Sequence, residues 1–167
     1  MSDTPKVILK PALVPRPLFN RSVCHVLGAK RKAWRSIRQQ VIDSVASTCE
    51  YCGAQYEKGM VCHEVWDYDD QDDTATLITF ALACSDCNFT LHAGLALEVG
   101  STEGSIGARG EQVVAHLAKV NEISNAEARA IVIRAFKEHA ERSRHSWEIG
   151  IAAHMVEKYP ALANLKL

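Results

Sequence analysis

Two Cys-x-x-Cys pairs organise this chain, in the segments CEYCG at residues 49–53 and CSDCNFTLHAG at residues 84–94. Four thiolates in two such pairs are the ligand set that a tetrahedral zinc ion takes in structural sites. In a reducing compartment this cysteine pattern is typical of metal binding rather than of disulfides. We therefore predict a structural zinc bound by Cys49, Cys52, Cys84 and Cys87.

The 31 residues between the two pairs are enough for a β-hairpin. Residues 60–66 alternate weakly between apolar and polar, and residues 75–83 form an apolar run, so both segments are predicted to be strands. The acidic run at residues 67–73 between them indicates a solvated hairpin tip. The hydrophobic pattern turns helical after Cys87, which predicts that a helix begins at the second pair.

Helices are expected on both sides of this unit. An apolar stripe with helical spacing predicts a first helix over residues 29–47. Glycines between residues 94 and 110 mark a connector, and residues 111–121 form an amphipathic helix. Ser124-Asn125-Ala126-Glu127 is a capping box that starts a helix running to about residue 144. A last helical segment is expected from Trp147 to just before Pro160.

The predicted fold class is α+β, with three parts along the chain. Residues 1–28 contain four of the five prolines, which predicts an extended arm because proline disfavours helix. Residues 29–100 form the zinc domain with its leading helix. Residues 101–167 form a helical C-terminal extension that caps the zinc core.

The formal net charge is −1, so nucleic-acid binding would need a local basic patch. Cations gather in the first half of the helix predicted at residues 29–47, where they oppose the helix macrodipole. Phosphate contact and an ordinary solvated face are equally compatible with this cluster. The cluster consists of Lys30, Arg31, Lys32, Arg35 and Arg38.

The chain has no apolar run near 18 residues and no signal sequence at its start. A protein of this composition is expected in the cytoplasm and not in a membrane.

The Cys62-His63-Glu64-Val65-Trp66 step on the first predicted strand and the Cys84-x-x-Cys87-Asn88-x-x-x-His92-x-Gly94 step resemble the HNH endonuclease family. The chain is similar in particular to a bacterial and phage subgroup of predicted HNH proteins. The resemblance implies a ββα-metal, or treble-clef, fold around the zinc. In two places the sequence departs from the pattern. It has Cys62 where the family commonly has Asp or His, and Asn88 where the subgroup has His.

The resemblance implies metal-dependent hydrolysis of DNA phosphodiester bonds. His63 matches the family's general base. His92 matches a ligand of the catalytic divalent metal, with Asn88 and Cys62 as possible further ligands. Magnesium, manganese or nickel are the candidate ions. Strand alternation directs Glu64 away from the face of His63, which weakens its role as an orienting group.

A second function remains open at this point. A catalytically inactive treble-clef zinc module would bind nucleic acid or a protein partner, as a regulator or a phage-encoded inhibitor. His63 would then be a packed strand histidine, and Cys62 a buried apolar thiol. Cys24 is expected to be structural. The remaining histidines show no partner pattern and are expected on helices or at the surface: His25, His116, His139, His145 and His154.

Overall fold

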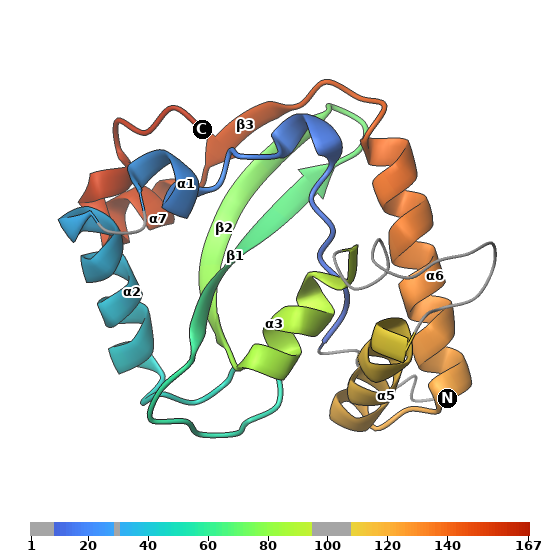
Figure 1. The fold of residues 1–167 in the computed structure, drawn as a ribbon. Helices are drawn as coiled ribbons and strands as arrows, with labels where there is room; N and C mark the ends of the chain where they lie inside the picture. The colour runs from blue at the N-terminus through green and yellow to red at the C-terminus, as the bar shows by residue number, and fades with distance from the viewer. Residues whose placement is uncertain (1–8, 29–30, 95–107) are drawn as a thin grey trace, which may run out of the picture.

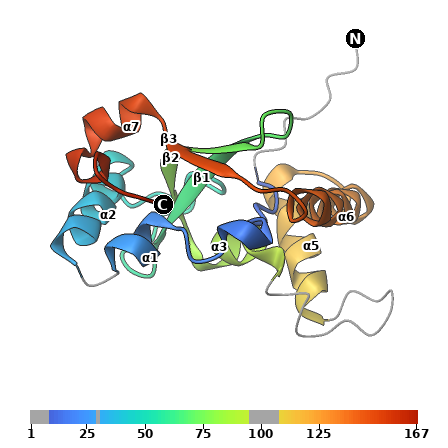
Figure 2. The same cartoon turned by 90° about the horizontal axis from the view of Figure 1, so that it is seen from above.

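The structure is a computed structural model, and it describes residues 9–28, 31–94 and 108–167. In these residues it is an α+β fold, the class that the sequence predicted, with a three-stranded sheet and six α-helices. The α-helices are α1 (Val23–Leu27), α2 (Lys32–Ser44), α3 (Ser85–Leu91), α5 (Ala108–Asn121), α6 (Asn125–Arg142) and α7 (Ala153–Lys158). Two short 3-10 helices are η1 (Arg16–Leu18) and η2 (Pro160–Leu162). The sheet lies between two groups of helices, α2 and α7 on one side and α3, α5 and α6 on the other (Figures 1 and 2).

The predicted hairpin is confirmed. Strand β1 (Val61–Asp69) pairs antiparallel with β2 (Thr74–Ala83). The acidic run contributes its first three residues to β1, so the turn itself is confined to residues 70–73. The register shifts between Val65 and Trp66, where Ile78 of β2 is the extra residue. The carbonyl of Ile78 contacts Nε2 of His154 in α7 at 2.7 Å, which ties the bulge to that helix.

The third strand corrects the sequence analysis. Residues 148–151 form β3 (Glu148–Ile151), which pairs parallel with β2 from Thr74 to Leu77. The expected helical segment from Trp147 is therefore wrong in its first part, and α7 begins only at Ala153. Ile149 and Ile151 are β-branched and two residues apart, which is the period of a strand. The C-terminal segment thus supplies part of the central sheet.

The arm is only partly extended. Its first eight residues lie outside the described residues, as do most of the predicted glycine connector and Lys30. After the last proline of the arm the chain forms α1, which corrects the expectation of an extended segment to residue 28. Oγ of Ser22 accepts a hydrogen bond from the amide of His25 at the start of α1. Gly28 ends the helix with φ 82°, a conformation that glycine adopts without strain.

Three contacts hold the arm along the side of the molecule that carries α3, α5 and α6 (Figure 1). The side chain of Asn121 pairs with the backbone of Leu9 in both directions, at 2.8 and 2.7 Å. The amide of Ala12 donates to the carbonyl of Leu91 at 2.8 Å. The amide of Arg16 donates to Oγ of Ser143 at 3.2 Å. The arm therefore joins the ends of three helices that are distant in sequence.

The two faces of the hairpin meet different partners. Phe80 of β2 makes edge contacts with Trp34 of α2 and with Tyr159, at ring-centroid distances of 5.8 and 5.4 Å. Glu64 is the residue opposite Phe80 across the ladder, so it shares that face. The neighbouring residue His63 points to the other face, toward α3.

The helices otherwise follow their predicted signals. Ser124 and Glu127 form the expected capping box at the start of α6. This helix ends at Arg142, close to the predicted residue 144. Helix α5 begins at Ala108, earlier than expected, so Gly110 belongs to a helix rather than to the connector.

An ion pair fastens the hairpin tip to the end of α6. The guanidinium of Arg142 donates two hydrogen bonds of 2.7 Å to the carboxylate of Asp70. It also lies 4.7 Å from the ring centre of Tyr68, whose ring meets Trp147 edge-on at 5.3 Å. Asp70 at this tip therefore has a structural partner.

We expect Arg142→Ala to lower the free energy of unfolding by about 1 kcal/mol, because a bidentate ion pair and a cation–π contact are lost together. Arg144→Ala is the matched control, since Arg144 forms an exposed ion pair with Glu141 three residues away. Urea unfolding of both variants measures the difference. Equal stability of the two variants would contradict a clamping role for Arg142.

Candidate metal centre and histidine site

The first cysteine pair sits in a tight loop. A bridge between Thr48 and Gln55 brings the two ends of the loop together, and the amide of Cys49 donates to the carbonyl of Ala54 at 2.8 Å. Gly53 has φ 73°, which permits the reversal directly after Cys52.

The second pair lies at the junction of β2 and α3. Cys84 is the N-cap of α3, and its Sγ accepts from the amide of Cys87 at 3.5 Å. The amide of Cys84 in turn donates to Sγ of Cys49 at 3.3 Å. These hydrogen bonds orient the thiols of both pairs toward one point.

The four sulfurs form the predicted cluster. Their Sγ atoms all lie within 4.8 Å of one another, and Sγ of Cys52 is 3.8 Å from Sγ of Cys84. A zinc ion with Zn–S bonds of about 2.3 Å requires sulfur–sulfur distances of about 3.8 Å at the edges of its tetrahedron. The cluster therefore could hold zinc, and its donor set fits that ion.

The electrostatics of the thiols also favour a cation. Burial and the neighbouring Cys84 raise the pKa of Cys87 far above its usual value. Burial raises the pKa of Cys49 as well, but hydrogen bonds from the amides of Cys52, Cys84 and Tyr51 outweigh it and leave this pKa lowered. Thiolates packed this closely repel one another, and a bound divalent cation removes that cost.

Two contacts of this centre have no sequence signal. The carboxylate of Glu50 accepts from the amide of Leu82 at 2.6 Å, which fixes the first pair to β2. Nε2 of His116, in α5, lies 3.2 Å from Sγ of Cys87. From the sequence, His116 is expected on a helix or at the surface, because it shows no partner pattern.

His63 and His92 come together on the other side of α3. His63 lies on β1, and His92 is the C-cap of α3. Their ring centroids are 5.1 Å apart and the ring planes cross at 76°. His63 is only 7% exposed. Burial, with a smaller contribution from His92, lowers the pKa of His63 to about 4, so the imidazole is neutral at pH 7. Burial also lowers the pKa of His92.

Both histidines line a cavity of about 930 Å³. Asn88 lies one helical turn before His92 and lines the same cavity. Its Oδ1 is buried and, among the described residues, has no hydrogen-bond partner. A carbonyl oxygen without a partner and imidazole nitrogens are ligand types that a divalent cation can use. His63, Asn88 and His92 thus line one cavity.

Cys62 lines the same cavity but lies on the opposite face of β1 from His63. Burial and then the charge of Glu64 raise the pKa of Cys62 to about 12. Glu64 is on that face too, and its carboxylate accepts from the amide of Cys24 in α1 at 3.3 Å. Burial raises the pKa of Glu64 to about 7.

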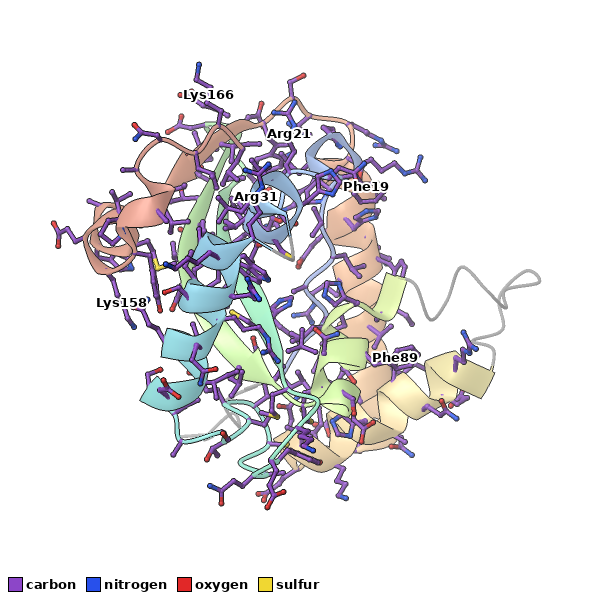
Figure 3. All side chains as sticks on the ribbon, turned by 60° about the vertical axis from the view of Figure 1, so that its left-hand side comes forward. Phe19, Arg21, Arg31, Phe89, Lys158 and Lys166 are labelled. Carbon is purple, nitrogen blue, oxygen red and sulfur yellow. The ribbon has the colours of Figure 1, made fainter. Side chains whose placement is uncertain are left out.

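The basic cluster divides into two parts. Arg31 is the N-cap of α2 and is exposed (Figure 3), as are Lys32 and Arg35. Arg38 is half-buried, donates to the carbonyl of Met60 at 2.8 Å and lines the cavity. The cavity is also lined by Lys10 and Arg21 of the arm. These two cations were not singled out from the sequence.

Comparison with models of protein families, with curated proteins and with solved structures finds no match to this chain. Within the part of the chain that the structure describes, no helix combines the length and the apolar character needed to cross a membrane.

Proposed function

We propose that this protein is an HNH-type endonuclease that hydrolyses DNA phosphodiester bonds with a divalent metal. The observation that carries the proposal is the 5.1 Å approach of the His63 and His92 rings within one cavity. Two imidazoles this close can address the same phosphate. The pairing joins a strand to the end of a helix, so it depends on the fold rather than on local sequence.

The arrangement around the cysteines supports a treble-clef core. One cysteine pair lies in a tight loop before the β1–β2 hairpin, and the other lies where α3 begins. This order of loop, hairpin and helix around four sulfurs is the arrangement that the resemblance implies. A zinc there would be structural, because four cysteines leave no coordination position open. The reducing cytoplasm would keep the thiols available.

His63 is the proposed general base. It is neutral at pH 7, which is the form that accepts a proton from water as the water attacks phosphorus. His92 would hold a divalent ion, with Oδ1 of Asn88 as a second ligand. Magnesium, manganese or nickel at this position would stabilise charge on the phosphate and the leaving oxygen.

The cations around the cavity support a phosphate-bearing substrate. Lys10, Arg21 and Arg38 line the cavity that contains the histidines. The exposed residues Arg31, Lys32 and Arg35 stand outside its lining and could contact the DNA backbone farther along.

A plasmid-nicking assay tests this function. We expect wild-type protein to nick supercoiled DNA with at least one of magnesium, manganese and nickel. His63→Ala should reduce the rate on the order of 10²-fold or more, because the base is lost. His25→Ala is the control, since His25 is an exposed histidine of α1. Equal rates for His63→Ala and wild type would remove His63 from the mechanism.

A non-catalytic zinc module that binds nucleic acid or a protein partner is the second candidate. The burial of His63 favours it, because a side chain that is 7% exposed has little access to water. No nicking with any of the three metals, from protein that carries one zinc, would select this function. A DNA mobility shift that Arg31→Glu and Arg35→Glu abolish would then identify nucleic acid as the ligand.

A further inference from the structure

His116 contacts the cysteine cluster from outside the two Cys pairs. Its Nε2 is 3.2 Å from Sγ of Cys87, and the side chain is half-buried. His116 is not part of the group whose donor atoms all lie within 4.8 Å of one another. Its position is therefore that of a neighbour to one sulfur, not of a fifth metal ligand.

The chemistry of a metal-bound cysteine fixes the direction of this contact. A thiolate bound to zinc has no proton and can only accept a hydrogen bond. Nε2 of His116 must then carry the hydrogen and donate it to Sγ of Cys87. Four thiolates on one Zn²⁺ carry excess negative charge, so a donor to one sulfur stabilises the whole centre.

Helix α5 is docked where this bond forms. Val113 and Leu117 are buried on α5 beside His116, and Phe89 of α3 lies on the side of that helix that faces α5 (Figure 3). Helix α5 also connects to α6, whose Arg129 pairs with Glu111 of α5. Cys87 thus contacts a helix that is itself paired with α6.

We propose that His116 donates a hydrogen bond to the zinc-bound thiolate of Cys87, and that this bond couples metal binding to the docking of α5 on α3. The inference rests on the cysteine cluster holding zinc, and it does not depend on nuclease activity. His116 is a positioning residue in this account, because it acts on the metal through Cys87.

Two variants separate the hydrogen bond from simple packing. His116→Phe keeps an aromatic ring but removes the donor, and His116→Gln keeps a donor nitrogen at similar reach. We expect His116→Phe to weaken zinc affinity by about 10- to 100-fold in a competition titration with a chelator. His116→Gln should retain most of the affinity. His139→Phe on α6 is the control for an aromatic replacement at another helix histidine.

Hydrogen exchange of the α5 amides measures the coupling. Removing zinc from the wild-type protein should speed exchange in α5 as well as in α3. In zinc-loaded His116→Phe, exchange in α5 should already be faster than in wild type. Neither readout uses DNA cleavage, so a failed nicking assay leaves this inference intact.

Several results would overturn the inference. If purified wild-type protein binds no metal, there is no zinc-bound thiolate for His116 to donate to. Equal losses of zinc affinity in His116→Phe and His116→Gln would show that the donor nitrogen does not account for the affinity. Unchanged α5 exchange on zinc removal would eliminate the coupling. If His116→Phe does not fold, nitrogen NMR of the zinc-loaded wild type decides, because a hydrogen on Nδ1 in place of Nε2 contradicts the bond.

Discussion

Chelation of the metal should unfold the core around α3, and Cys84→Ser should have the same effect without a chelator. The apparent binding energy of a structural zinc is about 10–16 kcal/mol in small zinc domains. The whole stability of a domain is about 5–15 kcal/mol, so little of the fold around the cluster would survive. We expect Cys84 to be the most sensitive position, because its sulfur lies in the cluster, its side chain caps α3 and its amide donates to Sγ of Cys49.

Circular dichroism during thermal unfolding, together with a measurement of bound zinc, checks this result. Cys24→Ser is the matched control, since Cys24 is half-buried but lies outside the cluster. It should keep its zinc and lose little stability. A Cys84→Ser variant that melts like wild type, or a wild type indifferent to chelator, would show that the four cysteines hold no structural metal.

The second large effect is a pair of opposed pH dependences at His63 and Glu64. The pKa of His63 is lowered from 6.5 to about 4, so its contribution to stability is complete above pH 6.5 and is lost as the pH falls toward 4. The pKa of Glu64 is raised from 4.5 to about 7, so its contribution is complete below pH 4.5 and is lost as the pH rises toward 7. Each shift corresponds to roughly 3 kcal/mol.

Between pH 4.5 and 6.5 the two groups change the free energy of unfolding in opposite directions, so their effects nearly cancel in the wild type. We expect Glu64→Gln to leave only the pH dependence of His63. The free energy of unfolding should then rise by roughly 3 kcal/mol from pH 4 to 6.5. We expect His63→Gln to leave only the pH dependence of Glu64. The free energy of unfolding should then fall by a similar amount from pH 4.5 to 7. Denaturant unfolding at a series of pH values gives each slope relative to wild type, so that any zinc release at low pH is common to all three proteins. Parallel profiles for all three proteins would contradict the burial of both side chains.

Local patterns in the sequence were sufficient for much of this structure. The Cys-x-x-Cys spacing predicted the cluster, the apolar run at residues 75–83 predicted β2, and the Ser124 capping box predicted the start of α6. Each of these signals is contained within a few residues of the element it defines. These local signals were therefore enough to predict the cysteine cluster, β2 and the start of α6.

Three features that the sequence did not predict share a different cause. Strand β3 is only four residues long, and its partner Thr74 is more than 70 positions away in sequence. The contact of His116 with Cys87 and the ion pair of Arg142 with Asp70 also join distant segments. Nothing local encodes such contacts, because they depend on how finished elements pack. The two-residue spacing of Ile149 and Ile151 was the one available signal for β3. A pattern of two residues is too short to distinguish a strand from a helix.

The histidine site was predictable from the sequence only in part. The positions of His63 and His92 could be matched to a family pattern, but their 5.1 Å approach depends on how α3 crosses β1. Strand alternation was enough to separate Glu64 from His63. The same alternation separates Cys62 from His63, although Cys62 lines the same cavity.

The parallel pairing of β3 with β2 also sets the order in which the chain can fold. On the ribosome the cysteine pairs and the β1–β2 hairpin emerge long before residue 148, so they can assemble while the far edge of β2 has no neighbour. An unpaired edge is where chains associate with one another. Residues 148–151 close that edge, and synthesis interrupted before Glu148 would therefore yield a chain prone to aggregation.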